Sequence, residues 1–244
     1  MFWHLFRYSL LRLSRSYLAM ALLVLTPLGL ISVIGLVSGQ IGASGEGRTG
    51  MDWIAASFVI GFQTIGGSYT LHYFHEDLFR PFKWRMRSLP LRIDAYGYSL
   101  LLASTLFSAF QGLVLILFTD WVYGANWGPL PWVMLVVLTV SFLSQLVCLL
   151  LVLTARRFKT AERLSEVYGL GSMLLAGIMF PLPNTPFFDF LSTYGNPISL
   201  GMNAIFAMAH ETDKAPAYVF LGLLLAATAI CAGAAALLGR KRLI

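Results

Sequence analysis

Apolar stretches of about 20 residues alternate with short polar segments along most of the chain. A helix of that length crosses the roughly 30 Å hydrocarbon layer of a bilayer, because each helical residue rises about 1.5 Å. The pattern therefore predicts an all-α polytopic membrane protein in which residues 1–244 form a single transmembrane domain. Its six transmembrane helices are expected at about residues 17–37, 53–73, 93–118, 130–154, 165–182 and 217–238.

Residues 1–16 have a different pattern, in which apolar residues recur at helical spacing and arginines interrupt them. The apolar positions are Phe2, Leu5, Phe6, Leu10 and Leu13. This arrangement is typical of an amphipathic helix that lies in the membrane interface. We therefore expect an N-terminal interfacial amphipathic helix before the first span.

The fifth apolar run is short and is followed by Pro181, Pro183 and Pro186, which cannot continue an α-helix. The sequence nevertheless stays apolar through much of 183–209. Apolar but broken backbone at membrane depth must be shielded by protein or line a cavity. We expect 183–209 to form a re-entrant segment after the fifth span, on the outer side. An apolar external loop that rests on the surface is the alternative.

Charge gives the chain an orientation. The protein is 58% hydrophobic and only 11% charged, whereas soluble domains carry about 25% charged residues. Of its 17 Lys and Arg residues, all but Arg48 and Lys214 lie in the N-terminal segment, the 74–92 loop, the 155–166 loop or the C-terminus. The positive-inside rule then predicts that both termini are cytoplasmic. The net charge of +6 is explained by these loops and does not indicate a nucleic-acid partner.

The segment 76–90 belongs to the longest of the basic loops. Pro81 can begin a short helix and Pro90 can end it, with Phe82 and Met86 on one face. Aromatic and basic residues on such a helix suit docking to a protein partner. A helix that lies on anionic lipid headgroups is an equally good interpretation.

Several polar residues in or near the spans are candidates for chemistry. His72, His75 and Glu76 have a spacing that can bind a metal, but no further strong ligand is identifiable, so no metal site is predicted. Ser68, with His72 one turn on, lacks the partners of a serine nucleophile, and no catalytic residue is predicted. The intramembrane amides are expected to bond across helices, with substrate contact as the alternative; they are Gln63, Gln111 and Gln145. The chain has no phosphate-binding G-x-x-x-x-G-K-[ST] loop.

Taken together, four features make the chain similar to the ABC-2 type permease family, the membrane subunits of type V ABC exporters. The first is the basic N-terminal amphipathic helix, and the second is the segment Glu76…Arg80…Arg87-Ser88-Leu89-Pro90-Leu91. The third is the long third span that begins near Tyr96-Gly97-Tyr98-Ser99. The fourth is Ala176-Gly177-Ile178-Met179-Phe180-Pro181 with the later Asn196-Pro197, which resembles the family's "SG-x-x-FP…NP" pattern. Phe79 to Phe82 depart from the family, which usually has a charged pair and a glycine there.

The resemblance implies a permease that works as a dimer, with a second copy or a homologous six-span subunit, in the bacterial plasma membrane. ATP and Mg²⁺ would bind a separate ABC ATPase, so this chain would carry no cofactor and would not itself be an enzyme. The segment 76–90 would be the cytoplasmic coupling helix, with contacts from Glu76, Asp77, Phe79, Arg80, Phe82, Trp84, Arg87 and Leu89. The substrate path would be lined by Phe58, Phe62, Gln63, Tyr69, Met173, Met179 and Phe180. The outer gate would include Pro181, Pro183, Pro186, Phe187, Asn196 and Pro197.

An apolar, aromatic and methionine-rich path suits hydrophobic or amphipathic cargo such as a drug, an antimicrobial peptide or a lipid. The expected function is therefore export of such cargo. Two alternatives stay open from the sequence: an intramembrane enzyme acting on lipid or protein, and a non-transporting membrane scaffold subunit.

Overall fold

The computed structural model describes residues 2–15, 17–41, 50–79, 93–155, 157–180, 182–183 and 185–243. Within these residues every regular element is a helix, which confirms the all-α prediction. The helices are α1 (Phe2–Arg15), α2 (Tyr17–Ile41), α3 (Gly50–Phe79), α5 (Ile93–Tyr123), α6 (Leu130–Thr154), α7 (Phe158–Leu175), α8 (Pro186–Thr193), α9 (Pro197–His210) and α10 (Ala215–Leu243).

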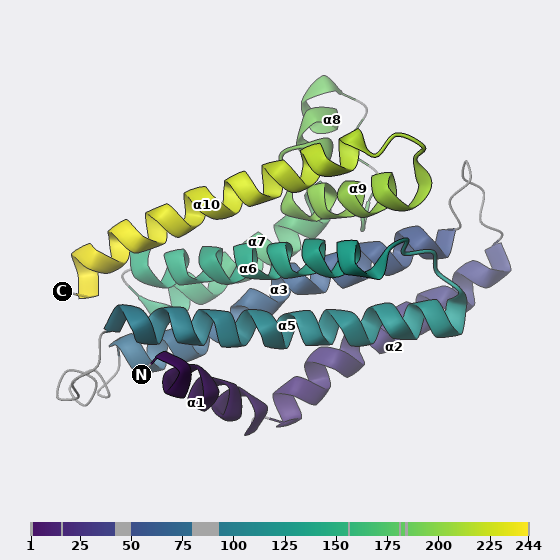
Figure 1. The fold of residues 1–244 in the computed structure, drawn as a ribbon. Helices are drawn as coiled ribbons and strands as arrows, with labels where there is room; N and C mark the ends of the chain where they lie inside the picture. The colour runs from purple at the N-terminus through teal and green to yellow at the C-terminus, as the bar shows by residue number, and fades with distance from the viewer. Residues whose placement is uncertain are drawn as a thin grey trace.

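The long helices run along a common direction, and both chain termini lie at the same end of the bundle (Figure 1). We call this the terminal end; α3 and α6 finish there and α5 begins there (Figure 1). The opposite end carries the α5–α6 turn and the α9–α10 turn (Figure 1). The short helix α1 packs on α5 near the terminal end, and α8 projects beside α9 at the other.

The core surrounds α6, which packs against α3, α5, α7, α9 and α10. Toward the opposite end it is built from branched aliphatic side chains such as Ile60, Val136, Val140 and Ile205, none more than 1% exposed. Toward the terminal end Leu71, Phe74, Leu100, Leu146 and others form a second buried cluster. Because interhelical space is filled along the whole bundle, the helices are fixed relative to one another by close packing.

Four helices are long and apolar enough to cross a membrane, judged by length and composition within the described residues. They comprise Gly50–Glu76, Tyr96–Tyr123, Leu130–Thr154 and Ala215–Gly239. A shorter apolar stretch, Ala21–Leu36, lies within α2. The number of six spans remains a prediction. It requires that α2 and α7 also cross the membrane, in addition to the four helices above.

The fifth predicted span differs in its bounds. The sequence pattern places it at 165–182, whereas α7 begins at Phe158 and ends at Leu175. The helix starts earlier than predicted, because it includes the charged segment 159–166. Its 18 residues give a length of about 27 Å. The helix ends before the prolines, because Gly177 adopts a φ of +71°. The Gly177 amide donates to the Leu174 carbonyl at 3.0 Å and the Ile178 amide donates to the Met173 carbonyl at 3.3 Å, which is a Schellman motif.

The predicted re-entrant segment contains α8 and α9. Each begins with a proline in its first turn, where the missing amide hydrogen costs nothing. Asn196 caps α9, because its side-chain oxygen accepts from the Ile198 amide at 3.0 Å. Helix α9 lies in the core and does not rest on the surface as a loop, since Ile198, Ala204 and Ile205 are at most 1% exposed.

Candidate functional site

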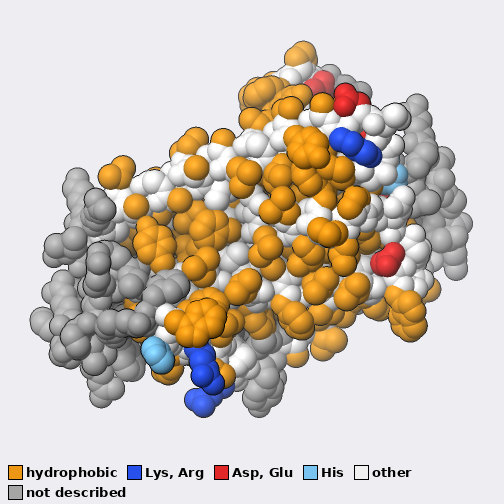
Figure 2. Space-filling view, viewed as in Figure 1, with side chains coloured by type: hydrophobic (Ala, Val, Ile, Leu, Met, Phe, Trp, Pro, Cys, Tyr) orange, Lys and Arg blue, Asp and Glu red, His pale blue; other side chains and the backbone are white. Residues whose placement is uncertain are grey.

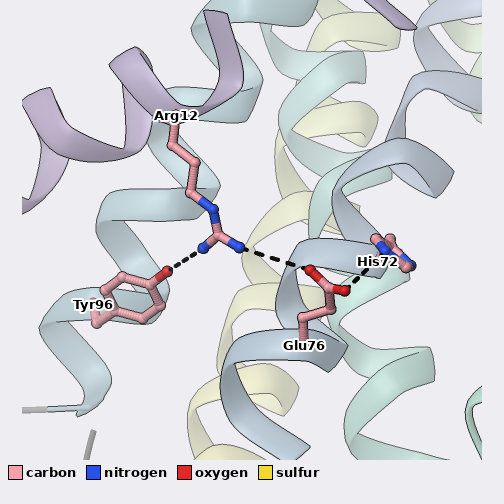
Figure 3. Close-up of polar contacts among 4 residues, drawn as sticks. All are labelled: Arg12, His72, Glu76 and Tyr96. Carbon is pink, nitrogen blue, oxygen red and sulfur yellow. Dashed lines mark hydrogen bonds and ion pairs between the residues drawn. The ribbon is translucent and has the colours of Figure 1, made fainter. Parts of the chain in front are cut away.

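A polar cluster at the terminal end joins three helices that are far apart in the sequence (Figure 3). Arg12 of α1 lies 3.8 Å from Glu76 of α3 and donates to the Tyr96 hydroxyl of α5 at 3.4 Å. On its other side Glu76 lies 3.2 Å from His72, one turn earlier on α3. The Arg12 guanidinium also lies 4.9 Å from the centre of the Tyr73 ring. Arg12 therefore fastens α1 to the last turns of α3 and the first turn of α5.

The position of Arg12 follows from the face that α1 buries. Phe6 and Leu13 are buried against Ala103 of α5. Arg12 lies at the edge of that face, so its aliphatic stem can pack while the guanidinium reaches Glu76. The side chains of Arg12 and Glu76 are 29% and 30% exposed, so the pair contributes about 1 kcal/mol or less to stability. It positions the helices more than it stabilises them.

Helix α7 contacts the end of α3 as well. The His75 ring stacks on Phe158, the first residue of α7, with centroids 4.2 Å apart and planes 7° from parallel. His72 makes an edge contact with the same ring at 5.8 Å. The end of α3 thus contacts α1 through Glu76 and α7 through His75. Within the described residues no three His, Cys, Asp or Glu side chains are grouped to hold a metal.

These contacts lie at the start of the predicted coupling segment 76–90. Glu76, the first of the predicted coupling residues, is part of the cluster. The side chains of Asp77 and Phe79 lie outside the described residues, as do Arg80, Phe82, Trp84, Arg87 and Leu89 altogether. Arg12 and Tyr96 are not among the predicted site residues. The apolar periodicity of α1 shows which face packs, but only the packed structure shows that Glu76 lies opposite Arg12.

The predicted path residues are in different environments. Phe58 and Phe62 are half-buried on α3, with ring centroids 6.3 Å apart. Met173 is buried, and its methyl group lies against Gly61 of α3. Met179 and Phe180 follow α7 and are exposed by 50% and 68%. The Tyr69 side chain lies outside the described residues.

Gln63 is completely buried among α3, α5 and α6. Its side-chain oxygen accepts from the Ser108 hydroxyl at 2.5 Å and from the Ser141 hydroxyl at 2.6 Å. Gln111 donates to the Leu23 carbonyl of α2 at 2.7 Å. The prediction that Gln63 and Gln111 bond across helices is therefore confirmed, and the structure places Gln63 in the packed interior of this chain.

The predicted gate residues divide into a buried joint and an exposed tip. Asn196 is 1% exposed and donates to the Ser172 carbonyl at 2.5 Å, which ties the start of α9 to the end of α7. Pro197 follows in the first turn of α9 and is half-buried. Pro183, Pro186 and Phe187 are exposed, and Pro181 lies outside the described residues.

A second polar contact, formed by residues that are not among the predicted site residues, lies at the opposite end. Asp52 in the first turn of α3 accepts from the Asn126 amide at 2.9 Å. His210, the last residue of α9, lies 3.8 Å from Asp52. The contact joins α3 to the α5–α6 turn and to α9. In the sequence this contact is indicated only by Asp52, which precedes an apolar run, because a carboxylate is favourable at a helix N-terminus.

An apolar stripe faces outward along α7. Its side chains are spaced three or four residues apart and are 42–66% exposed: Leu164, Val167, Leu170 and Leu174. Phe187 and Phe190 of α8 are exposed by 68% and 64%. Figure 2 shows hydrophobic side chains over the middle of another face as well, with charged side chains toward the ends. Such a surface suits lipid or a second membrane protein.

These features define a class of protein: a multi-pass helical membrane protein with a polar junction at one end and a helix, α7, that ends before a proline-rich segment. The family follows from comparison with known sequences. The family model of the ABC-2 type transporter matches residues 1–209, and the chain belongs to this family. It is thus the membrane component of an ABC transporter, a permease and not a catalytic subunit. No curated protein matches the sequence.

Proposed function

We propose that the chain is the permease subunit of an ATP-driven exporter that moves hydrophobic or amphipathic cargo out of a bacterial cell. Two permease subunits, either two copies of this chain or this chain and a homologous six-span subunit, would form the path. Each would bind an ABC ATPase that holds ATP and Mg²⁺, as members of this family normally do. Both termini would be cytoplasmic, since nearly all the Lys and Arg residues lie in the two terminal segments and in the 74–92 and 155–166 loops of the sequence.

The observation that carries the proposal is the junction of Arg12, Glu76 and Tyr96. Helix α3 runs unbroken to Phe79, and the chain then enters the basic segment 80–92. A force applied to that segment by an ATPase would act first on the last turn of α3. Because Arg12 and the His75–Phe158 stack attach α1 and α7 to that turn, the three helices would move together.

The surface of α7 and α8 supports the dimer and the kind of cargo. The stripe from Leu164 to Leu174 and the exposed Phe180 and Phe187 offer an apolar wall, and the sequence has no charged residue from 167 to 188. A second permease packed near this wall would enclose a path that accepts apolar groups. Asn196 would fix the outer end of the wall, because it holds α9 to α7.

The first experiment is purification of the tagged chain from its native membranes. We expect a co-purifying subunit that hydrolyses ATP, in equal amount to the permease. Recovery of the chain without any ATP-hydrolysing protein, from membranes where it is abundant, would contradict the proposal.

The second experiment tests the junction by exchanging its charges. Arg12→Glu and Glu76→Arg each place like charges together, and each should lower cargo-stimulated ATP hydrolysis by about fivefold, as expected for a pair worth about 1 kcal/mol. The double variant restores opposite charges and should recover most of the activity. Arg163→Glu, an exposed position on α7, is the matched control and should have little effect. Equal losses in the single and double variants would refute the role of the pair.

A further inference from the structure

Helix α1 has two unlike faces. Phe6, Ser9 and Leu13 are 1–9% exposed on the face that packs against the bundle. On the other face Tyr8 and Leu11 are exposed by 63% and 53%, and Trp3, whose ring stacks on Phe6 with centroids 5.4 Å apart, is exposed by 68%. An amphipathic helix of a soluble protein would turn polar groups outward, so these large apolar side chains need a further neighbour.

The three arginines of α1 are divided between the faces. Arg12 turns toward the bundle and pairs with Glu76. Arg7 and Arg15 are exposed on the outer face, and neither has an ion-pair partner among the described residues. His4 is exposed beside them, and the helix contains no acidic residue. Figure 2 shows basic side chains and a histidine next to hydrophobic side chains over α1, at the lower left.

This combination matches one kind of neighbour. Tryptophan and tyrosine favour the level of lipid headgroups, and arginine beside them extends its charge to phosphate. The first residue of the apolar helix α2 is Tyr17, so α1 is held at the membrane surface by its own chain. We propose that Trp3, Arg7, Tyr8, Leu11 and Arg15 form a binding surface for anionic phospholipid headgroups in the leaflet at the terminal end.

The surface is linked to the junction described above. The inner face of α1 holds Glu76 through Arg12, while the outer face holds the leaflet. Lipid charge would therefore set the position of α1 against the last turn of α3. The binding itself requires neither ATP nor cargo, so it is tested independently of the proposed export function.

The test measures the preference of the purified full-length chain, with any subunits that co-purify, for phosphatidylglycerol over phosphatidylcholine in neutral detergent. Bound lipids are counted by native mass spectrometry. Each arginine near an anionic surface contributes about 1 kcal/mol, so Arg7→Gln with Arg15→Gln should reduce the preference about thirtyfold at low salt. Added salt should reduce the wild-type preference in the same direction.

The matched control is Lys159→Gln with Arg163→Gln on α7. It removes the same charge from another exposed helix, where Glu162 and Glu166 lie nearby in sequence. We expect this pair to retain the preference. Equal loss in both pairs, or no loss in the α1 pair, would overturn the proposal. So would a photo-crosslinker at Leu11 that traps a protein subunit and no lipid in native membranes.

Discussion

Gly67→Ala is a direct test of how tightly α3 and α6 pack. A Cβ atom at Gly67 would lie 2.8 Å from the Ser144 backbone oxygen, 2.6 Å from its hydroxyl oxygen and 2.8 Å from the Cys148 sulfur. The hydroxyl could rotate away only by giving up its 2.5 Å hydrogen bond to the Thr64 carbonyl. The backbone oxygen cannot rotate, so the two helices must separate.

The cost follows from these distances. Ordinary contacts of a Cβ atom begin at 3.4 Å, so the helices must move apart locally by about half an ångström. Overpacking of this kind costs about 1–3 kcal/mol, and a lost interhelical hydrogen bond in a membrane protein adds about 0.6 kcal/mol. Alanine regains about 1 kcal/mol of helix propensity over glycine. The net loss of unfolding free energy is about 0.5–2.5 kcal/mol.

The assay is thermal unfolding in detergent, followed by tryptophan fluorescence. At about 2–4 °C per kcal/mol for a protein of this size, the loss corresponds to a midpoint lower by about 1–10 °C. Gly97→Ala in α5 and Gly222→Ala in α10 are the controls, since a Cβ atom at either position meets nothing within 4 Å. These variants should unfold at the wild-type temperature or slightly above it. A Gly67→Ala protein as stable as these controls would refute the close α3–α6 contact.

Three further variants test other joints. Gln63→Leu should cost about 1 kcal/mol in thermal unfolding, because Ser108 loses its acceptor while Ser141 keeps the Val137 carbonyl at 2.7 Å; lost transport at unchanged stability would instead place Gln63 on the cargo path. Asp52→Asn and His210→Gln should be non-additive by about 1 kcal/mol in a double-mutant cycle, and simple additivity would mean that the 3.8 Å contact carries no energy. Gly177→Ala should lower stability by about 1–2 kcal/mol because the φ of +71° is strained for alanine, whereas Gly171→Ala inside α7 should not; equal stability of the two would argue against the Schellman motif.

Much of the fold could be predicted because helix formation in a bilayer depends on local composition. The apolar run at 130–154 coincides with α6, since it contains no charged residue, and no proline after its first turn, at which the helix would stop. Gly177 also indicated the end of α7 in the sequence. The prediction relied on the prolines that follow, so it placed the end at residue 182 and not at Leu175. A glycine at a helix end is a stop signal of its own, because it can adopt a positive φ.

The sequence alone indicated that the chain crosses a membrane as helices, that its basic residues are concentrated in the terminal segments and two loops, and that the helix stops after the fifth apolar run. Tertiary structure decided which of three similar arginines on α1 is a junction residue, because Arg12 finds Glu76 only when α1 packs on α5 and α3. It also decided that Gln63 and Met173 are buried while Met179 and Phe180 are exposed. Residues 63 and 108, or 52 and 210, meet only after distant helices pack. Local patterns report the length and polarity of a helix, whereas the neighbour of each side chain depends on how all the helices share the space between them.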